Sequence, residues 1–265
     1  MIPPFSLFHG NCYTTTPRKV SWPYKVCPEL LFYPRLVALL IRGSRLSKKN
    51  SYTGVLWAAQ SERIVRYLEA LGCRFRVEGM EHFHKLSTPC VFAGNHMSTL
   101  ETMCLPAMIQ PAKNTTFVIK ESLLKYPFFR DLLSARCPIP LARVNPREDF
   151  KKIMNDGTEL LQNGVSVIIF PQSGRRQVFT PSEFNSGAVK LARNAGVPVV
   201  PLALDTRAWA EGKLISDFGR LHAEREIHFR FGEPITVQGN GKAEQAALVD
   251  FIAGSLREWN VPVAD

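Results

Sequence analysis

Apolar residues follow two different rhythms along the chain, and the change comes near Cys73. Before this point, apolar positions recur at helical spacing in residues 30–46, a stretch interrupted by Pro34, and in residues 54–72. Residues 1–27 contain four prolines and no regular pattern. We therefore expect an irregular segment over residues 1–27 and a pair of helices over residues 28–72.

From Cys73 onward, short apolar strands alternate with helices, and we expect residues 73–265 to form one domain. Repeated alternation of this kind predicts an α/β fold with a mostly parallel central sheet flanked by helices. Residues 226–235 alternate between polar and apolar, as an edge strand does. The expected strands cover residues 73–80, 89–95, 115–120, 137–143, 165–170, 197–204 and 226–235, and the expected helices cover residues 98–109, 121–134, 146–164, 185–196 and 242–259.

The net charge of +10 at pH 7 favours an anionic partner. Eight basic residues and a single acid, Glu29, lie between positions 18 and 49, around the apolar residues 30–41. This stretch of 12 residues contains Pro34 and Arg35 and is shorter than the roughly 20 apolar residues that a membrane span needs. Either the stretch forms an anchor in the membrane surface, or it forms a helix packed on the core.

Aromatic and basic residues around this stretch are typical of the headgroup level of a membrane. We therefore expect the helical pair to dock on an anionic membrane surface, as a peripheral or monotopic element on the cytoplasmic face of a bacterial inner membrane. Replacing Leu31, Leu36 and Leu40 with Asp is expected to release the protein while the sheet stays folded.

Other classes of protein fit less well. The six cysteines contain no CxxC and no zinc-ligand spacing with His, so we expect no metal site and a reducing compartment. The N-terminus lacks the pattern of a signal peptide. Only the charge suggests a nucleic-acid partner, and we expect none because no binding module accompanies it.

The segment NHMSTLE, residues 95–101, follows an expected strand and opens an expected helix. His96 can act as a general base near neutral pH, and a carboxylate on its other ring nitrogen would fix its tautomer. His96 and Glu101 can meet across such a turn. However, Ser98 and Glu101 also form a capping box, which needs no catalysis to explain it. The segment alone leaves both interpretations open.

A second segment, FPQSGRR at residues 170–176, also follows an expected strand. Its glycine-containing turn and its arginines suit a phosphate or a developing oxyanion, whereas a solvated loop is the alternative. Lys120 and Arg143 stand at two further expected strand ends. They would form an anion site if they converged on one edge of the sheet, where ligands of such folds bind.

These segments, in this order, resemble the glycerolipid acyltransferase family, and the resemblance covers residues 75–235. NHMSTLE is similar to the family motif NHxSxxD, with Glu101 in place of Asp, and FPQSGR is similar to FPEGTR, including Pro171. Residues 120–143 resemble the stretch of the family that ends in an arginine. VPVVPLAL at residues 197–204, with Pro201, resembles the motif V-P-V-x-P.

The resemblance implies an O-acyltransferase that moves a fatty acyl group from acyl-CoA or acyl carrier protein to a lysophospholipid hydroxyl. The default acceptor is 1-acylglycerol-3-phosphate, which gives phosphatidic acid, and no cofactor or metal is implied. His96 would act as the base, Glu101 would orient it, and Asn95 and Ser98 would support the turn. The residues implied in binding the acceptor or its phosphate are Lys120, Arg143, Gln172, Ser173, Gly174 and Arg175.

The departures from the family motifs bear on specificity. Glu101 keeps the charge of the usual Asp, whereas Gln172 removes a charge and Ser173-Gly174 shifts the flexible position by one. We therefore expect an altered choice of acceptor. The alternatives are glycerol-3-phosphate, another lysophospholipid or a lyso-aminolipid, and a non-catalytic lipid-binding member of the family.

Overall fold

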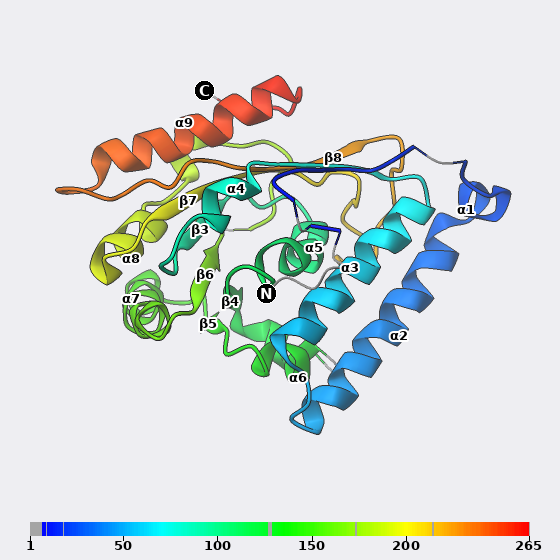
Figure 1. Ribbon diagram of the computed structural model, residues 1–265, viewed down its shortest axis with the longest axis horizontal. Coiled ribbons are helices and arrows are strands. Elements are labelled where there is room, and N and C mark those ends of the chain that lie inside the picture. Colours follow the sequence, from blue (N-terminus) through cyan, green and yellow to red (C-terminus); the bar gives the residue numbers. More distant parts are fainter. Residues whose placement is uncertain are drawn as a thin grey trace.

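The structure, a computed structural model, describes residues 7–8, 10–17, 19–126, 129–172, 174–213 and 215–264. These residues form one eight-stranded sheet between two layers of helices (Figure 1). In spatial order the strands are β1 (Tyr13–Thr14), β2 (Arg74–Glu78), β8 (Glu226–Phe231), β7 (Val199–Asp205), β3 (Val91–Gly94), β6 (Ser166–Ile169), β4 (Thr115–Lys120) and β5 (Ile139–Leu141).

The sheet is mostly parallel, as the alternating pattern predicts. The pairs β1–β2 and β7–β8 are antiparallel, and the other neighbouring strands are parallel. The carboxyl ends of β3, β6 and β7 therefore lie at one edge, where ligands of such sheets bind. The α/β fold expected from the sequence is confirmed.

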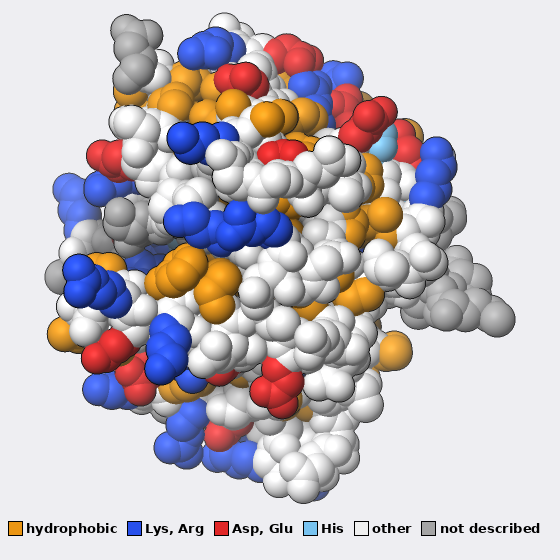
Figure 2. All heavy atoms as spheres, turned by 90° about the vertical axis from the view of Figure 1, so that its left-hand side faces the viewer, with side chains coloured by type: hydrophobic (Ala, Val, Ile, Leu, Met, Phe, Trp, Pro, Cys, Tyr) orange, Lys and Arg blue, Asp and Glu red, His pale blue; other side chains and the backbone are white. Residues whose placement is uncertain are grey.

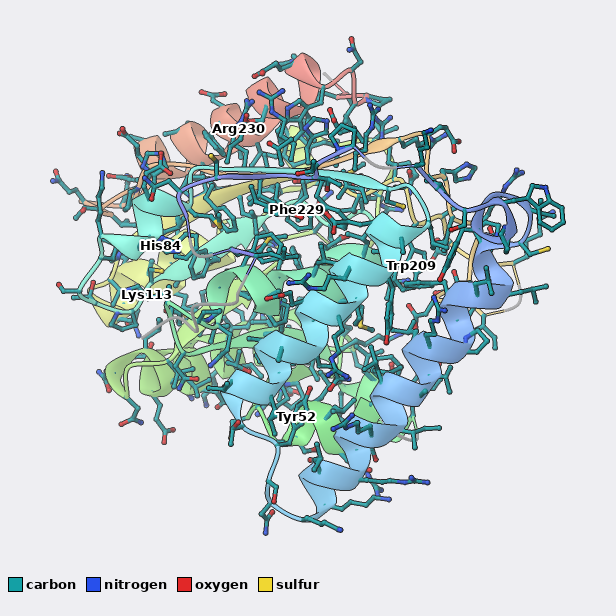
Figure 3. The ribbon with its side chains drawn as sticks, turned by 45° about the vertical axis from the view of Figure 1, so that its right-hand side comes forward. Tyr52, His84, Lys113, Trp209, Phe229 and Arg230 are labelled. Carbon is teal, nitrogen blue, oxygen red and sulfur yellow. The ribbon has the colours of Figure 1, made fainter. Side chains whose placement is uncertain are left out.

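The prediction that residues 226–235 form an edge strand is wrong. β8 lies between β2 and β7 and pairs with both. Its outer face is polar because the last helix, α9 (Lys242–Glu258), meets it with polar contacts. Arg230 donates to Glu258 at 2.5 Å, and His228 stacks on Trp259 with ring centroids 4.7 Å apart. In β8, the alternation of polar and apolar residues therefore indicates a face that is covered by polar groups rather than a face open to water. Figure 3 shows Arg230 beneath α9.

Alternate residues of the central strands face two separate apolar layers. Phe92 and Ile168 pack with the layer that contains α2 (Pro28–Lys48), α3 (Gly54–Ala70), α4 (Met80–His84) and α5 (Thr99–Ile109). Val91 and Val167 pack with the layer of α7 (Pro146–Gln162), α8 (Gly187–Ala195) and α9. This buried, three-layer arrangement holds the strand ends that carry both motifs.

The remaining elements refine the expected boundaries. In place of one helix over residues 121–134 there are η1 (Glu121–Lys125) and α6 (Phe129–Ser134), and residues 127–128 between them lie outside the described residues. The segment expected to be irregular contains β1 and α1 (Trp22–Val26), which are too short for a periodic pattern to reveal. A further short helix, η2, covers Pro181–Glu183.

The N-terminal helical pair shares the core of the sheet. The helix α2 runs without interruption through Pro34, and its side chains Phe32, Leu36 and Leu40 are buried in the layer that covers the sheet. Leu36 and Leu40 are only 2% and 6% exposed, so we now expect Asp at these positions to destabilise the fold rather than to leave it intact.

Near its start, the helical pair exposes apolar side chains other than Leu36 and Leu40. Trp22, Val26 and Leu30 are 74%, 55% and 73% exposed. Among the described residues, none of the helices combines the length and the apolar character required to cross a bilayer.

Candidate active site

The NHMSTLE segment forms the turn from β3 into α5. Asn95 fixes this turn to the neighbouring strand β7: its Nδ2 donates to the carbonyl of Leu204 at 2.8 Å, and its Oδ1 accepts from the Leu204 N–H at 2.9 Å. Asn95 is only 2% exposed, so these bonds satisfy groups that water does not reach. The position of His96 is therefore tied to the central sheet.

Glu101 meets His96 and caps the helix with the same carboxylate. His96 Nδ1 lies 2.8 Å from Glu101 Oε1, and the backbone N–H groups of Met97 and Ser98 donate to that oxygen at 2.7 and 2.9 Å. Ser98 Oγ in turn accepts from the Leu100 N–H, which completes the capping box. The pairing with His96 and the capping box, left as alternatives by the sequence, are present together.

The buried Glu101 carboxyl is held in its ionised form. Burial alone raises its pKa, but hydrogen bonds and charge from His96, and hydrogen bonds from Thr206 and Ser98, outweigh burial and lower the pKa below its ordinary value. Thr206 Oγ1 donates to Oε2 at 2.5 Å. An ionised carboxylate accepts the proton on His96 Nδ1, so Nε2 keeps a lone pair that can receive another proton.

The FPQSGRR segment holds the other side of His96. The Phe170 ring stacks on the imidazole with centroids 4.5 Å apart and planes 8° apart. Gln172 Oε1 accepts the backbone N–H of His96 at 2.7 Å, and the Arg176 N–H donates to the His96 carbonyl at 2.8 Å. Gln172, expected to contact the acceptor, thus also positions the base, whereas Ser173 lies outside the described residues.

His96 opens into a cavity of about 720 Å³, a size typical of small-molecule sites. Its walls come from both motifs, from both members of the N-terminal helical pair, and from α5, α6, α7 and α8. One part is polar or charged, and the rest is mainly apolar. The polar part includes His96, Thr99, Arg143, Gln172, Arg175, Lys190 and Asp217, and the apolar part includes Leu40, Trp57, Ile64, Met103, Phe117, Leu123, Phe129, Leu132 and Leu133.

Arg175 is held at the cavity by an ion pair. Its Nη2 donates to Asp217 Oδ1 at 2.6 Å, and the same oxygen accepts from Thr99 Oγ1 at 2.6 Å. Asp217 therefore ties Arg175 to the first turn of α5, next to His96. The side chain of Arg175 is 21% exposed, so it remains accessible from the cavity.

Arg143 also lines the cavity, from the turn after β5. Its backbone adopts φ 57°, which is uncommon for a residue other than glycine. The Asp149 carboxylate stabilises this turn by accepting the N–H groups of Ala142 and Arg143 at 3.1 and 2.9 Å. Figure 2 views the face that carries α7 and α8, where Lys and Arg side chains lie among apolar ones.

Other predicted residues fall in different places. Lys120, at the end of β4, is exposed and does not line the cavity, which reaches its neighbour Ile119 instead, so its role in the anion site stays a prediction. Gly174 is half-buried beside Arg175. Pro171 lines the cavity, whereas Pro201 pairs with Ala93 inside the sheet.

Sequence reasoning missed two residues that hold the site. Thr206 follows the carboxyl end of β7, a position that could have marked it, because β3 ends at the same edge. Asp217 lies in an irregular stretch between β7 and β8 that carries no periodic signal. In the described part of the chain, no three His, Cys, Asp or Glu side chains are grouped to hold a metal ion.

Residues 74–205 match the family model described as Acyltransferase. The 1-acyl-sn-glycerol-3-phosphate acyltransferase of Pseudomonas aeruginosa is 37% identical over 132 residues, which are 50% of this chain and 49% of the relative. The chloroplastic enzyme of the same name, BAT2, from Brassica napus is 33% identical over 131 residues, which are 48% of this chain and 36% of the relative. The match thus spans half or less of these relatives.

A solved structure has the same fold. It is the 1-acyl-sn-glycerophosphate (LPA) acyltransferase PlsC from Thermotoga maritima, with a TM-score of 0.64 and 18% identity. The alignment covers 91% of this chain and 98% of that one. The segment that matches the family model, residues 74–205, contains His96, Glu101, Arg143 and Arg175. Residues 74–205, about half of the chain, therefore belong to the acyltransferase family.

Proposed function

We propose that the protein is an O-acyltransferase that converts 1-acylglycerol-3-phosphate into phosphatidic acid, with acyl-CoA or acyl carrier protein as the donor. The observation that carries the proposal is the His96–Glu101 pair at a cavity with cationic and apolar walls. The names of the Pseudomonas and Brassica relatives support this choice of acceptor.

In the proposed reaction, His96 Nε2 takes the proton of the acceptor hydroxyl while the hydroxyl oxygen attacks the thioester carbonyl carbon. The ionised Glu101 stabilises the imidazolium that forms. The tetrahedral intermediate then collapses, the C–S bond breaks, and His96 returns the proton to the leaving thiolate. Backbone N–H groups near Gly174 are candidates to stabilise the oxyanion.

The polar and the apolar parts of the cavity suit the phosphate and the hydrocarbon chain of the substrates, respectively. Arg143 and Arg175 carry charge for the acceptor phosphate, and Asp217 holds Arg175 in place. The apolar part, between the helical pair and the sheet, suits a hydrocarbon chain. Because Gln172 contacts the backbone of His96, its effect on acceptor choice would act through the position of the base.

A membrane surface is the proposed working place. Trp22, Val26 and Leu30 expose apolar side chains near the start of α2, and Arg35 and Arg42 on the same helix are exposed bases. This combination suits the interface of an anionic bilayer. We assign docking to this end of the helical pair, on the cytoplasmic face of a bacterial membrane.

The test is transfer of a labelled acyl group to 1-acylglycerol-3-phosphate by the purified protein and by its His96→Ala variant. We expect a loss of about 10²- to 10⁴-fold, the usual contribution of a general base. His82→Ala is the matched control, because His82 does not line this cavity. Transfer unchanged in His96→Ala would exclude the mechanism, and membrane binding without any transfer by the unmodified protein would identify a non-catalytic member.

A further inference from the structure

The cavity has a guanidinium at the end remote from His96. Arg136 follows α6 and lines the cavity beside Tyr52 and Trp57. Its Nη2 donates to Asn114 Oδ1 at 2.8 Å, just beyond the C-terminal end of α5, whereas His96 bonds Glu101 in the first turn of α5. The 11 residues of α5 extend about 16 Å at a rise of 1.5 Å per residue.

Arg136 is incompletely satisfied in this position. Its hydrogen bonds go to the side-chain amides of Asn114 and Gln110 rather than to a carboxylate, and its guanidinium lies 5.1 Å from the centroid of the Trp57 ring. Burial lowers the pKa of the guanidinium. Among the described residues, five buried side-chain nitrogen or oxygen atoms lack a partner, and Arg136 Nε is one of them. Arg136 Nη1 also makes no hydrogen bond, but it is not buried, so it remains available to a ligand in the cavity that Arg136 lines.

The neighbouring polar groups bond to each other rather than to Arg136. Tyr52 OH donates to Gln60 Oε1 at 2.8 Å, and Gln60 Nε2 donates to the Leu39 carbonyl at 3.1 Å. Leu132 and Leu133 complete this end of the cavity, and Figure 3 shows Tyr52 in the loop that joins α2 to α3. A plain hydrocarbon here would leave the Nη1 donors of Arg136 without a partner, whereas an oxygen atom of the chain would accept from them.

We propose that the Arg136 end of the cavity selects acyl chains that carry a hydroxyl or carbonyl oxygen near their far end. The inference rests on the proposed function, because it places the acyl chain in this cavity. An extended chain with C–C bonds of about 1.5 Å advances about 1.25 Å per carbon, so the oxygen would stand about 13 carbons from the reacting carbonyl.

The experiment compares two donors of equal length with the same acceptor: a saturated acyl-CoA and the acyl-CoA with a hydroxyl on its terminal carbon. The chains run from roughly 10 to 16 carbons. The readout is the ratio of kcat/KM for the hydroxylated donor to kcat/KM for the plain donor. We expect this ratio to peak in the middle of the series and to fall about tenfold in Arg136→Met, as for a lost hydrogen bond to a charged group.

Two further variants make the result specific. Arg136→Lys keeps the positive charge but lacks the planar guanidinium and its Nη1 donors, so the ratio should also fall. It serves as the readout if Arg136→Met does not fold. Arg130→Met, on α6 but outside the cavity lining, should leave the ratio unchanged. Equal ratios in the unmodified protein and both Arg136 variants would overturn the inference, whereas absence of transfer from every donor would instead refute the proposed function.

Discussion

Replacing Glu101 with Gln tests the double role of its carboxylate, because the substitution keeps the shape and removes the charge. The neutral amide retains one oxygen, which can still accept from Met97, but its nitrogen cannot accept from Ser98. A neutral group also no longer stabilises the imidazolium of His96 or fixes the proton on Nδ1. We therefore expect losses in both stability and turnover.

The size of each loss follows from the contacts of Glu101. Exchanging a charged acceptor for a neutral one weakens each hydrogen bond by about 1 kcal/mol, and two or three of the bonds from His96, Ser98 and Thr206 are affected, which gives about 2 to 3 kcal/mol. For a chain of this size, that corresponds to a fall in Tm of about 4 to 12 °C. We expect kcat to fall by about 10²- to 10⁴-fold.

Thermal unfolding by circular dichroism and acyl transfer at saturating substrate measure the two losses separately. Glu69→Gln is the matched control: Glu69 is 5% exposed and accepts from Tyr13 and Thr15, but it does not line the cavity. It should lower Tm without changing kcat per folded molecule. Full turnover by Glu101→Gln would refute the orienting role of Glu101, and an unchanged Tm would refute the capping role.

Three other outcomes follow. The pKa of Glu101 is lower in the folded state, so its contribution to stability is complete above about pH 5 and is lost as the pH falls below about 4.3. Urea unfolding should therefore show that the difference in free energy of unfolding between the native protein and Glu101→Gln shrinks with acid. A difference that stays constant would contradict this. Combining Trp22→Asp with Leu30→Asp should reduce sedimentation with anionic vesicles at unchanged Tm, and full sedimentation would exclude this docking surface. Arg175→Met should raise KM for 1-acylglycerol-3-phosphate by about 10- to 100-fold, and the more exposed Arg176→Met should not; equal effects would contradict a specific phosphate contact.

The sequence predicts those parts of the fold and site that depend on local pattern. Continuous apolar runs reveal the buried strands β3, β6 and β7, and the capping letters Ser98 and Glu101 mark the start of α5. The motifs that contain His96 and Arg175 each follow an expected strand, parallel strands end at one edge, and both residues line the cavity.

The features that the sequence does not predict depend on contacts between distant segments. The position of β8 inside the sheet depends on the meeting of Arg230 with Glu258, which alternation alone cannot reveal. Asp217 reaches Arg175 from an irregular loop, 42 positions away. Lys120 has the right residue type at the right strand end, but its side chain is exposed outside the cavity.

The strands at the two ends of the sheet have a consequence for how the protein behaves at high concentration. The outermost strands, β1 and β5, have only 2 and 3 residues. Longer strands such as β7, with 7 residues, are paired on both sides. Because unpaired strand edges recruit other chains, the short outer strands of the described sheet offer few backbone groups of their own for intermolecular β-pairing. This topology disfavours edge-to-edge aggregation of the folded protein, independently of its surface charge.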